Sequence, residues 1–199
     1  MKPLTLDKNG FDSDTSTGGG YRFGVQAVSI SPASLKHRLG KGIFLQPKNS
    51  LMNPGVTSKE GILKVLTAYN PWWKTGLVNP KLSKTYKRFA FYEAMKRINQ
   101  TDIRRTVVLT GTRRVGKTTI QYQMIEALLK SGAAPQKIVF ISMDHPMLKL
   151  SGFSEILECY HENIYADQDV YYFFDEVPYA QDWDKWLKTI YDMQPDTKV

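Results

Sequence analysis

The feature that most constrains the fold is a glycine-rich turn of fixed spacing at residues 111–118, Gly-Thr-Arg-Arg-Val-Gly-Lys-Thr. A β-branched, apolar run at 106–110 precedes it, and a helical pattern at about 117–130 follows it. Gly111 and Gly116 permit backbone conformations that turn successive N–H groups toward one point, and the following helix adds its positive dipole end. A strand, a turn and a helix in this order predict a phosphate-binding loop that holds a nucleoside triphosphate.

The residues of this loop have distinct expected roles. Lys117 supplies a cation to the β- and γ-phosphates and takes part in catalysis, while Thr118 offers its hydroxyl to Mg²⁺. Arg113 and Arg114 either contact phosphates or a neighbouring subunit, or they face solvent. We expect the whole loop to contact the nucleotide: Gly111, Thr112, Arg113, Arg114, Val115, Gly116, Lys117, Thr118 and Thr119.

An acidic pair, Asp175 and Glu176, closes the apolar run at 170–174. Because the carboxyl ends of parallel strands meet at the ligand crevice, the pair is expected beside the phosphate loop. Asp175 is then expected to hold Mg²⁺ through water, and Glu176 is the catalytic residue that orients and deprotonates the attacking water. Asp144 either shares this crevice or only shapes a turn.

The residues that follow Asp175 favour ATP over GTP as the nucleotide. GTP-binding switch proteins usually carry Asp-x-x-Gly at this point and Asn-Lys-x-Asp for guanine, and neither pattern occurs here. We therefore expect a Mg²⁺-dependent ATP hydrolase whose nucleotide state is coupled to a partner or to conformational change. A nucleic-acid-binding module regulated by ATP, and a scaffold with a degenerate nucleotide site, stay open as alternatives.

Strand and helix patterns alternate through the C-terminal half, which predicts an α/β fold with a parallel sheet flanked by helices on both faces. A sheet of three strands is small, and Lys198-Val199 could begin another strand. We therefore expect the nucleotide-binding core at 105–199 to be incomplete and the chain to be the N-terminal part of a longer protein. Strands are expected at 106–110, 137–142 and 170–174, and helices at about 117–130, 153–164 and 182–192.

Two further regions precede this core. Residues 1–57 lack helical periodicity, carry Gly18-Gly19-Gly20 and contain short apolar pieces at 25–30 and 43–45. We expect a poorly ordered or small accessory extension there, with a β element as one alternative.

Residues 58–104 are expected to form a helical lead-in segment. Ser58 can cap a first helix, and Trp72-Trp73 is expected to anchor the segment onto the core, by ordinary packing or as part of a partner site. A second helix is predicted at about 85–99, with Phe89, Phe91, Met95 and Ile98 as buried positions.

The net charge of +8 is unevenly distributed. Residues 59–120 contain fourteen Lys and Arg against three Asp and Glu, whereas residues 121–199 contain six against thirteen. The basic part suits polyphosphate and leaves nucleic acid open as a partner, although a solvated helix face would look the same. A protein partner and a homo-oligomer also stay open. The single Cys159 and the lack of a signal or membrane-spanning pattern favour a cytoplasmic protein without a membrane partner.

Four segments together resemble a known family: 111–119, Ile-Ser-Met-Asp at 141–144, Tyr-Phe-Phe-Asp-Glu-Val at 172–177, and 183–192. They resemble the AAA-type ATPases of bacteria and archaea. The resemblance is greatest to a largely uncharacterised group with a Gly-Pro-Arg-Arg-Val-Gly-Lys-Thr-Thr Walker A loop, where this chain has Thr112 in place of proline.

The resemblance covers about residues 60–199 and implies a P-loop NTPase-type fold. It also implies a γ-phosphate sensor, an arginine finger, a helical lid and a C-terminal domain, none of which is assigned in this chain. Since arginine fingers contribute orders of magnitude to hydrolysis, the chain alone is expected to bind ATP but to hydrolyse it weakly.

Overall fold

The computed structural model of the chain describes residues 23–28, 58–100, 102 and 105–199. The expectations for Gly18-Gly19-Gly20 and for 43–45 lie outside these residues. None of the helices in the described ranges has the length and apolar character needed to cross a bilayer.

The strands are β1 (Phe23–Val28), β2 (Thr106–Gly111), β3 (Ile138–Ser142) and β4 (Tyr171–Asp175). The α-helices are α1 (Lys59–Tyr69), α2 (Trp72–Thr75), α3 (Pro80–Ser83), α4 (Phe89–Ile98), α5 (Lys117–Lys130), α6 (Pro146–Leu150), α7 (Phe153–Asn163) and α8 (Trp183–Met193); short 3₁₀ turns span Pro135–Lys137 and Val177–Tyr179.

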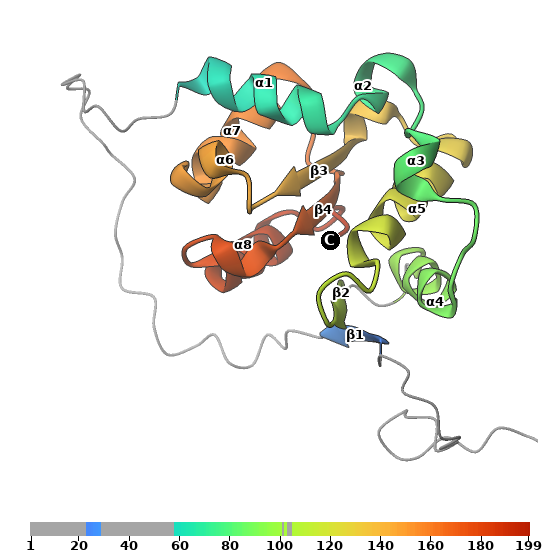
Figure 1. Cartoon of the computed structure of the whole chain (residues 1–199). Coiled ribbons are helices and arrows are strands. Elements are labelled where there is room, and N and C mark those ends of the chain that lie inside the picture. Colours follow the sequence, from blue (N-terminus) through green and yellow to red (C-terminus); the bar gives the residue numbers. More distant parts are fainter. Residues whose placement is uncertain (1–22, 29–57, 101, 103–104) are drawn as a thin grey trace, which may run out of the picture.

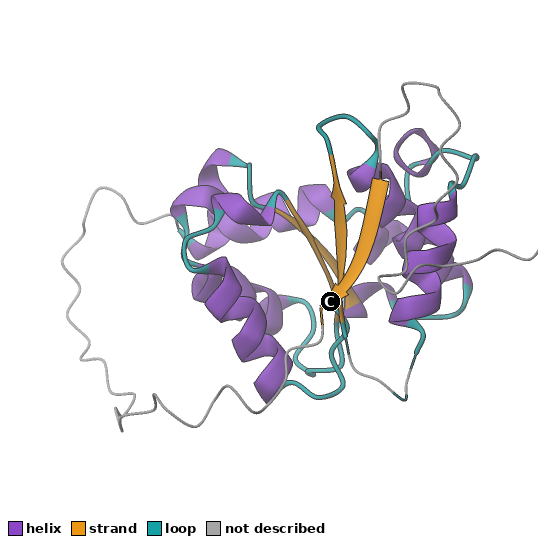
Figure 2. Ribbon diagram, turned by 90° about the horizontal axis from the view of Figure 1, so that it is seen from below, coloured by secondary structure: helices purple, strands orange, loops and turns teal. Residues whose placement is uncertain are grey.

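The parallel part of the sheet consists of β3 and β4, which pair in register with Phe140 opposite Phe173. Helices cover both of its faces (Figures 1 and 2). On one face Tyr122 of α5 stacks on Phe140 with ring centroids 4.8 Å apart. On the other face Phe153 of α7 lies 5.0 Å from Phe174, whose side chain points opposite to that of Phe173 because side chains alternate along a strand. The predicted α/β class with a small parallel sheet is therefore confirmed.

The strand before the phosphate loop differs from the expectation. β2 pairs with β1 in an antiparallel ladder, not with β3 or β4, and its central residues are only partly buried. The physical reason lies at residues 198–199. Lys198 forms a parallel bridge with Tyr171, and the N–H of Val107 donates to the carbonyl of Val199 at 2.8 Å. These two residues therefore stand between β4 and β2 in the manner of a strand, and β2 and β4 do not pair directly.

The outer edge of β3 is closed by the Asn70-Pro71-Trp72-Trp73 segment. Asn70 is fully buried, and its amide accepts from the N–H of Phe140 at 2.6 Å and donates to the Phe140 carbonyl at 2.9 Å. The indole N–H groups of Trp72 and Trp73 both donate to the carbonyl of Ile138, at 3.0 and 2.8 Å. This segment satisfies the backbone groups that an open strand edge would expose, so the tryptophans do anchor the lead-in onto the core.

The first lead-in helix forms as predicted, because the Ser58 hydroxyl caps it by accepting from the N–H of Gly61. The second begins later than predicted, at Phe89 instead of about residue 85. The separate turn α3 ends at Ser83, and its C-cap, Lys84, has a positive φ of 51° that breaks helical continuity. Phe89 is consequently 78% exposed at the first turn of α4, and the expectation that it is buried is wrong.

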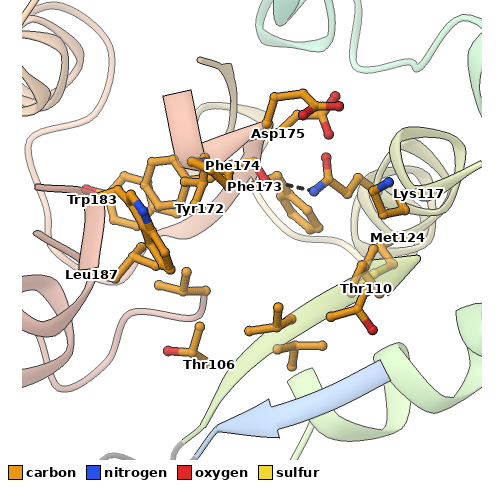
Figure 3. Close-up of a pocket in the computed structure, with 18 of the residues that line it drawn as sticks. Thr106, Thr110, Lys117, Met124, Tyr172, Phe173, Phe174, Asp175, Trp183 and Leu187 are labelled. Atoms are coloured by element: carbon orange, nitrogen blue, oxygen red, sulfur yellow. Dashed lines mark hydrogen bonds between the residues drawn. The ribbon is translucent and has the colours of Figure 1, made fainter. Parts of the chain in front are cut away.

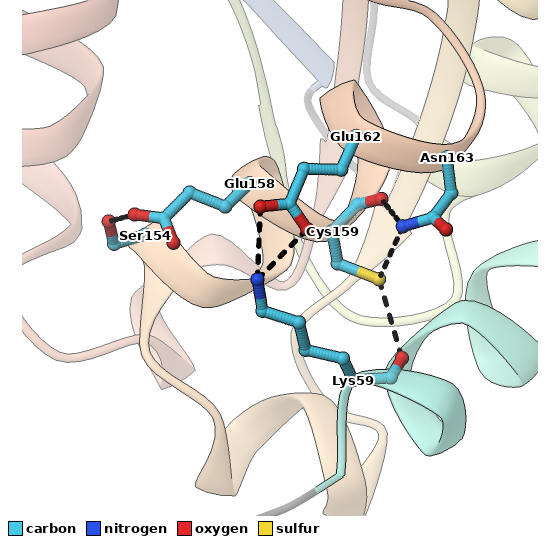
Figure 4. Close-up of polar contacts among 6 residues, drawn as sticks. All are labelled: Lys59, Ser154, Glu158, Cys159, Glu162 and Asn163. Carbon is cyan, nitrogen blue, oxygen red and sulfur yellow. Dashed lines mark hydrogen bonds and ion pairs between the residues drawn. The ribbon is translucent and has the colours of Figure 1, made fainter. Parts of the chain in front are cut away.

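Polar contacts join helix α1 to α7 (Figure 4). Lys59 forms an ion pair with Glu162 at 2.9 Å. The buried Cys159 donates its thiol to the carbonyl of Lys59 at 3.4 Å, and Asn163 donates to the carbonyl of Cys159. Burial raises the pKa of the Cys159 thiol, which therefore stays protonated and serves as a packing residue.

Candidate functional site

The turn between β2 and α5 forms an open loop at the carboxyl end of β2. Gly111 has a φ of 151° and Gly116 a φ of 95°, both in the region that favours glycine. Arg114 also takes a positive φ, 64°, which is strained for a residue with a side chain. Residues 111–114 are exposed, so the backbone of the loop is accessible to a ligand.

Helix α5 begins at Lys117 directly after this loop. Its N-cap, Gly116, provides no side chain to accept from the first-turn N–H groups. Those groups and the helix dipole therefore face the loop without a side-chain cap, as an anion site requires. The Nζ of Lys117 donates to the carbonyls of Gly111 and Thr112, at 3.0 and 3.1 Å, so the ammonium lies across the opening of the loop.

The loop between β2 and α5 and the acidic end of β4 meet at Thr118 and Asp175. The Thr118 hydroxyl donates to Oδ2 of Asp175 at 2.8 Å, which joins positions 57 residues apart in the sequence. The backbone of Asp175 is fixed as well, because its carbonyl accepts from the N–H of Met143 at 2.9 Å. A hydroxyl and a carboxylate in contact form a pair of hard oxygen donors, which fits a Mg²⁺ ion that takes its other ligands from water and phosphate.

Two more carboxylates lie near Asp175. Burial raises the pKa of Asp175 above its ordinary value; the Thr118 hydrogen bond opposes this shift, while the charges of Glu176 and Asp144 add to it. Asp144 follows β3, is exposed and accepts from the Ser142 hydroxyl at 2.6 Å. Of the two alternatives for Asp144, its charge effect on Asp175 favours a place in the same crevice. In the described part of the chain, no group of three or more His, Cys, Asp or Glu side chains is arranged as a complete metal site.

Glu176 occupies a strained backbone position. Its φ of 51° and ψ of 37° lie in the left-handed region, which costs a non-glycine residue about 1–3 kcal/mol. The next residue, Val177, begins the 3₁₀ turn Val177–Tyr179, so this conformation redirects the chain at the end of β4. The side chain of Glu176 is partly buried.

The remaining loop residues divide by exposure. Arg113 and Arg114 are exposed, and among the described residues neither takes part in an ion pair. Val115 and Thr119 are partly buried, and Thr112 contributes the carbonyl that Lys117 contacts.

Three residues that the sequence reasoning did not single out connect the site to its surroundings. Arg88 donates from its guanidinium to the carbonyl of Val115. Gln121 of α5 donates to the carbonyl of Phe174 at 2.9 Å and so ties the loop helix to the acidic strand. Gln123 is 1% exposed and donates to the backbone before α4. Gln121 and Gln123 could have been singled out from the sequence, because both are polar residues among the apolar positions of α5.

A cavity of about 590 Å³ opens beside the site (Figure 3). Lys117 and Asp175 lie at its polar end, next to the loop, and Glu176 also lines the cavity. The rest runs between β2 and β4, where apolar side chains line it, among them Leu109, Met124, Phe173, Trp183 and Leu187. Only the polar end has the chemistry that a triphosphate needs, so we place the candidate site there and not in the apolar part.

The chain is similar in sequence to a known domain family and to an archaeal protein. Residues 103–199 match the family model described as an AAA domain. Over 142 residues, 66% of this chain, the sequence is 31% identical to the uncharacterized protein MJ1637 of Methanocaldococcus jannaschii, and the match spans 29% of that protein's length. No solved structure matches the chain. The similarities support an AAA-like P-loop family for the part of the chain that carries the loop and the acidic pair.

Proposed function

We propose that this chain binds ATP together with Mg²⁺ and acts as an ATP hydrolase of AAA type, with its nucleotide state coupled to a partner or to conformational change. The observation that carries the proposal is the 2.8 Å hydrogen bond from Thr118 to Asp175. It brings a phosphate-loop hydroxyl and the carboxylate at the end of β4 into one site, although nothing local in the sequence requires them to meet.

The loop supplies the binding energy for the phosphates. The N–H groups of 111–119 and of the first turn of α5 donate to phosphate oxygens, and Lys117 adds a full positive charge. Lys117 at present contacts two carbonyl oxygens and, among the described residues, no carboxylate, so its charge is not neutralised by an ion pair.

The residues that would hold Mg²⁺ are Thr118 and Asp175. The ion would neutralise charge on the phosphate oxygens during transfer. Glu176, the neighbour of Asp175, accepts a proton from the attacking water and orients it. Its fixed, strained backbone favours this division of roles, because strained residues cluster at sites where geometry matters.

Phosphate release from Mg-ATP by the wild type and by Glu176→Gln tests the hydrolytic part of the proposal. The amide of Gln has nearly the same shape as the carboxylate but cannot take the proton. We expect Glu176→Gln to lower the rate by at least about 100-fold, the usual contribution of a general base, while ATP binding is retained. Glu155→Gln, on α7, is the matched control and leaves the rate unchanged. Equal rates for the wild type and Glu176→Gln would show that Glu176 is not the base.

A further inference from the structure

The segment leading into α4 contacts the loop between β2 and α5 through the side chain of Arg88. Arg88 precedes the first residue of α4, and its guanidinium donates to the carbonyl of Val115 at 2.5 Å, across 27 positions of sequence. We propose that Arg88 is a positioning residue for the loop: it holds the Val115–Gly116 peptide in the orientation that nucleotide binding requires. This inference rests on the proposed function, since it assigns how the loop of that site is kept in shape.

The contact of Arg88 with the Val115 carbonyl also sets the direction in which the N–H of Gly116 points. A trans peptide is planar, and its C=O and N–H point in opposite directions. No cis peptide occurs in the described residues. Because Arg88 holds the carbonyl of Val115, the N–H of Gly116 is turned to the opposite side of the peptide, away from Arg88. This N–H is one of the loop donors assigned to the phosphates.

Gly116 is also the position at which this peptide could turn most easily. Its φ of 95° is held without a side chain, and no side-chain cap fixes the start of α5 at this residue. A glycine linkage has more accessible backbone conformations than any other residue. A β-carbon built at Gly116 would have the guanidinium of Arg88 as its nearest neighbour, at 3.8 Å. Arg88 therefore lies directly against the flexible link that it stabilises.

The chain shortly before Arg88 is held to α5. Gln123 of α5, 1% exposed, donates to the carbonyl of Tyr86 at 2.8 Å and lies 3.4 Å from the carbonyl of Lys84. The backbone immediately before Arg88 is thus fastened to the same helix that begins at the phosphate loop. In the described part of the chain no carboxylate forms an ion pair with Arg88, so its charge adds to the positive field at the loop.

A positioning role for Arg88 and a direct contact with the terminal phosphate predict different effects on the affinities for Mg-ATP and Mg-ADP. If Arg88 acts on the loop backbone, Mg-ATP and Mg-ADP lose affinity by the same factor when it is removed, because the same loop holds both. If Arg88 contacted the terminal phosphate, only Mg-ATP would be affected. Lysine can donate one of the two or more bonds that a guanidinium offers, so Arg88→Lys should recover part of the loss.

The experiment is isothermal titration of the wild type, Arg88→Ala, Arg88→Lys and the control Lys96→Ala with Mg-ATP and Mg-ADP. Lys96 is an exposed cation on α4, so its loss tests for a mere change in net charge. We expect Arg88→Ala to weaken both nucleotides equally, by about tenfold or more, as for the loss of a charged hydrogen bond. Arg88→Lys should fall in between, and Lys96→Ala should match the wild type.

Unchanged affinity in Arg88→Ala, or a loss confined to Mg-ATP, would overturn the positioning role while the proposed function stands. A wild type that binds neither nucleotide would overturn the proposed function, and this inference with it. Should Arg88→Ala not fold, Arg88→Met keeps the apolar stem and carries the same comparison.

Discussion

The hydroxyl of Thr118, in the first turn of α5, donates a 2.8 Å hydrogen bond to Oδ2 of Asp175 at the end of β4. This contact brings a residue that directly follows the loop between β2 and α5 together with the acidic end of β4. Each partner is fixed by its own element, since α5 follows the loop at once and Asp175 is the last residue of its strand. Both partners of this contact therefore lie at the ends of secondary-structure elements.

Removing the carboxylate at this contact should remove the effect of the metal on nucleotide binding. Asp175→Asn keeps the shape and can still accept from Thr118, but it offers Mg²⁺ no charge. We expect the wild type to bind ATP at least about tenfold more tightly with Mg²⁺ than with a chelator, and Asp175→Asn to show little difference. Titrations with and without EDTA measure this, with the exposed Asp192→Asn as control. A full Mg²⁺ effect in Asp175→Asn would exclude Asp175 as a ligand.

The raised pKa of Asp175 predicts a pH dependence of stability. Because burial disfavours the carboxylate, the folded state binds a proton more readily than the unfolded state. Relative to Asp175→Asn, the metal-free wild type is therefore least stable at neutral pH and gains stability as the pH falls through the raised pKa. Urea unfolding of both proteins between pH 7 and 4 checks the direction. A wild type that loses stability relative to the variant as the pH falls would contradict it.

The strained backbone of Glu176 predicts an unusual order of stabilities. At a φ of 51°, glycine is relaxed whereas alanine is not, so Glu176→Gly should be more stable than Glu176→Ala by about 1 kcal/mol. Both variants lose the carboxylate, so the comparison isolates the backbone. Chemical denaturation measures the difference. The reverse order would mean that the left-handed conformation is not present in solution.

The buried amide of Asn70 is expected to be a major contribution to the stability of the core. Asn70→Ala leaves the N–H and the carbonyl of Phe140 without their partner, at a cost of about 2–4 kcal/mol. Asn99→Ala, at an exposed helix end, is the control and should change the free energy of unfolding by less than about 0.5 kcal/mol. A loss below 1 kcal/mol in Asn70→Ala would show that another group, such as water, satisfies this edge.

Local patterns in the sequence predicted most helices and strands, and they predicted that Lys117 and Asp175, at the polar end of the cavity, lie close together. The spacing of Gly111, Gly116 and Lys117 and the apolar run before Asp175 each depend on neighbouring residues, and strand-end geometry then places them together. The contacts of Arg88 with Val115 and of Asn70 with Phe140 were not predicted. They join a side chain to a backbone group 27 and 70 positions away, and no periodic pattern encodes such a partner.

The pairing of β2 could not be predicted for a similar reason. Its apolar residues suit either a parallel or an antiparallel neighbour, and the choice of β1 depends on a distant segment. The exposure of Phe89 was missed because the positive φ of Lys84 separates α3 from α4, and a lysine gives no signal for that conformation.

The most direct test of the proposed nucleotide site is the thermal unfolding of the wild type and of Lys117→Ala with and without Mg-ATP, with Lys130→Ala at the far end of α5 as control. At about 100 times the dissociation constant, bound nucleotide stabilises the folded state by about 2.7 kcal/mol. The wild type and Lys130→Ala should therefore unfold at a clearly higher temperature with Mg-ATP, and Lys117→Ala should not respond. An equal response of Lys117→Ala, or none in the wild type, would contradict binding of ATP at this loop.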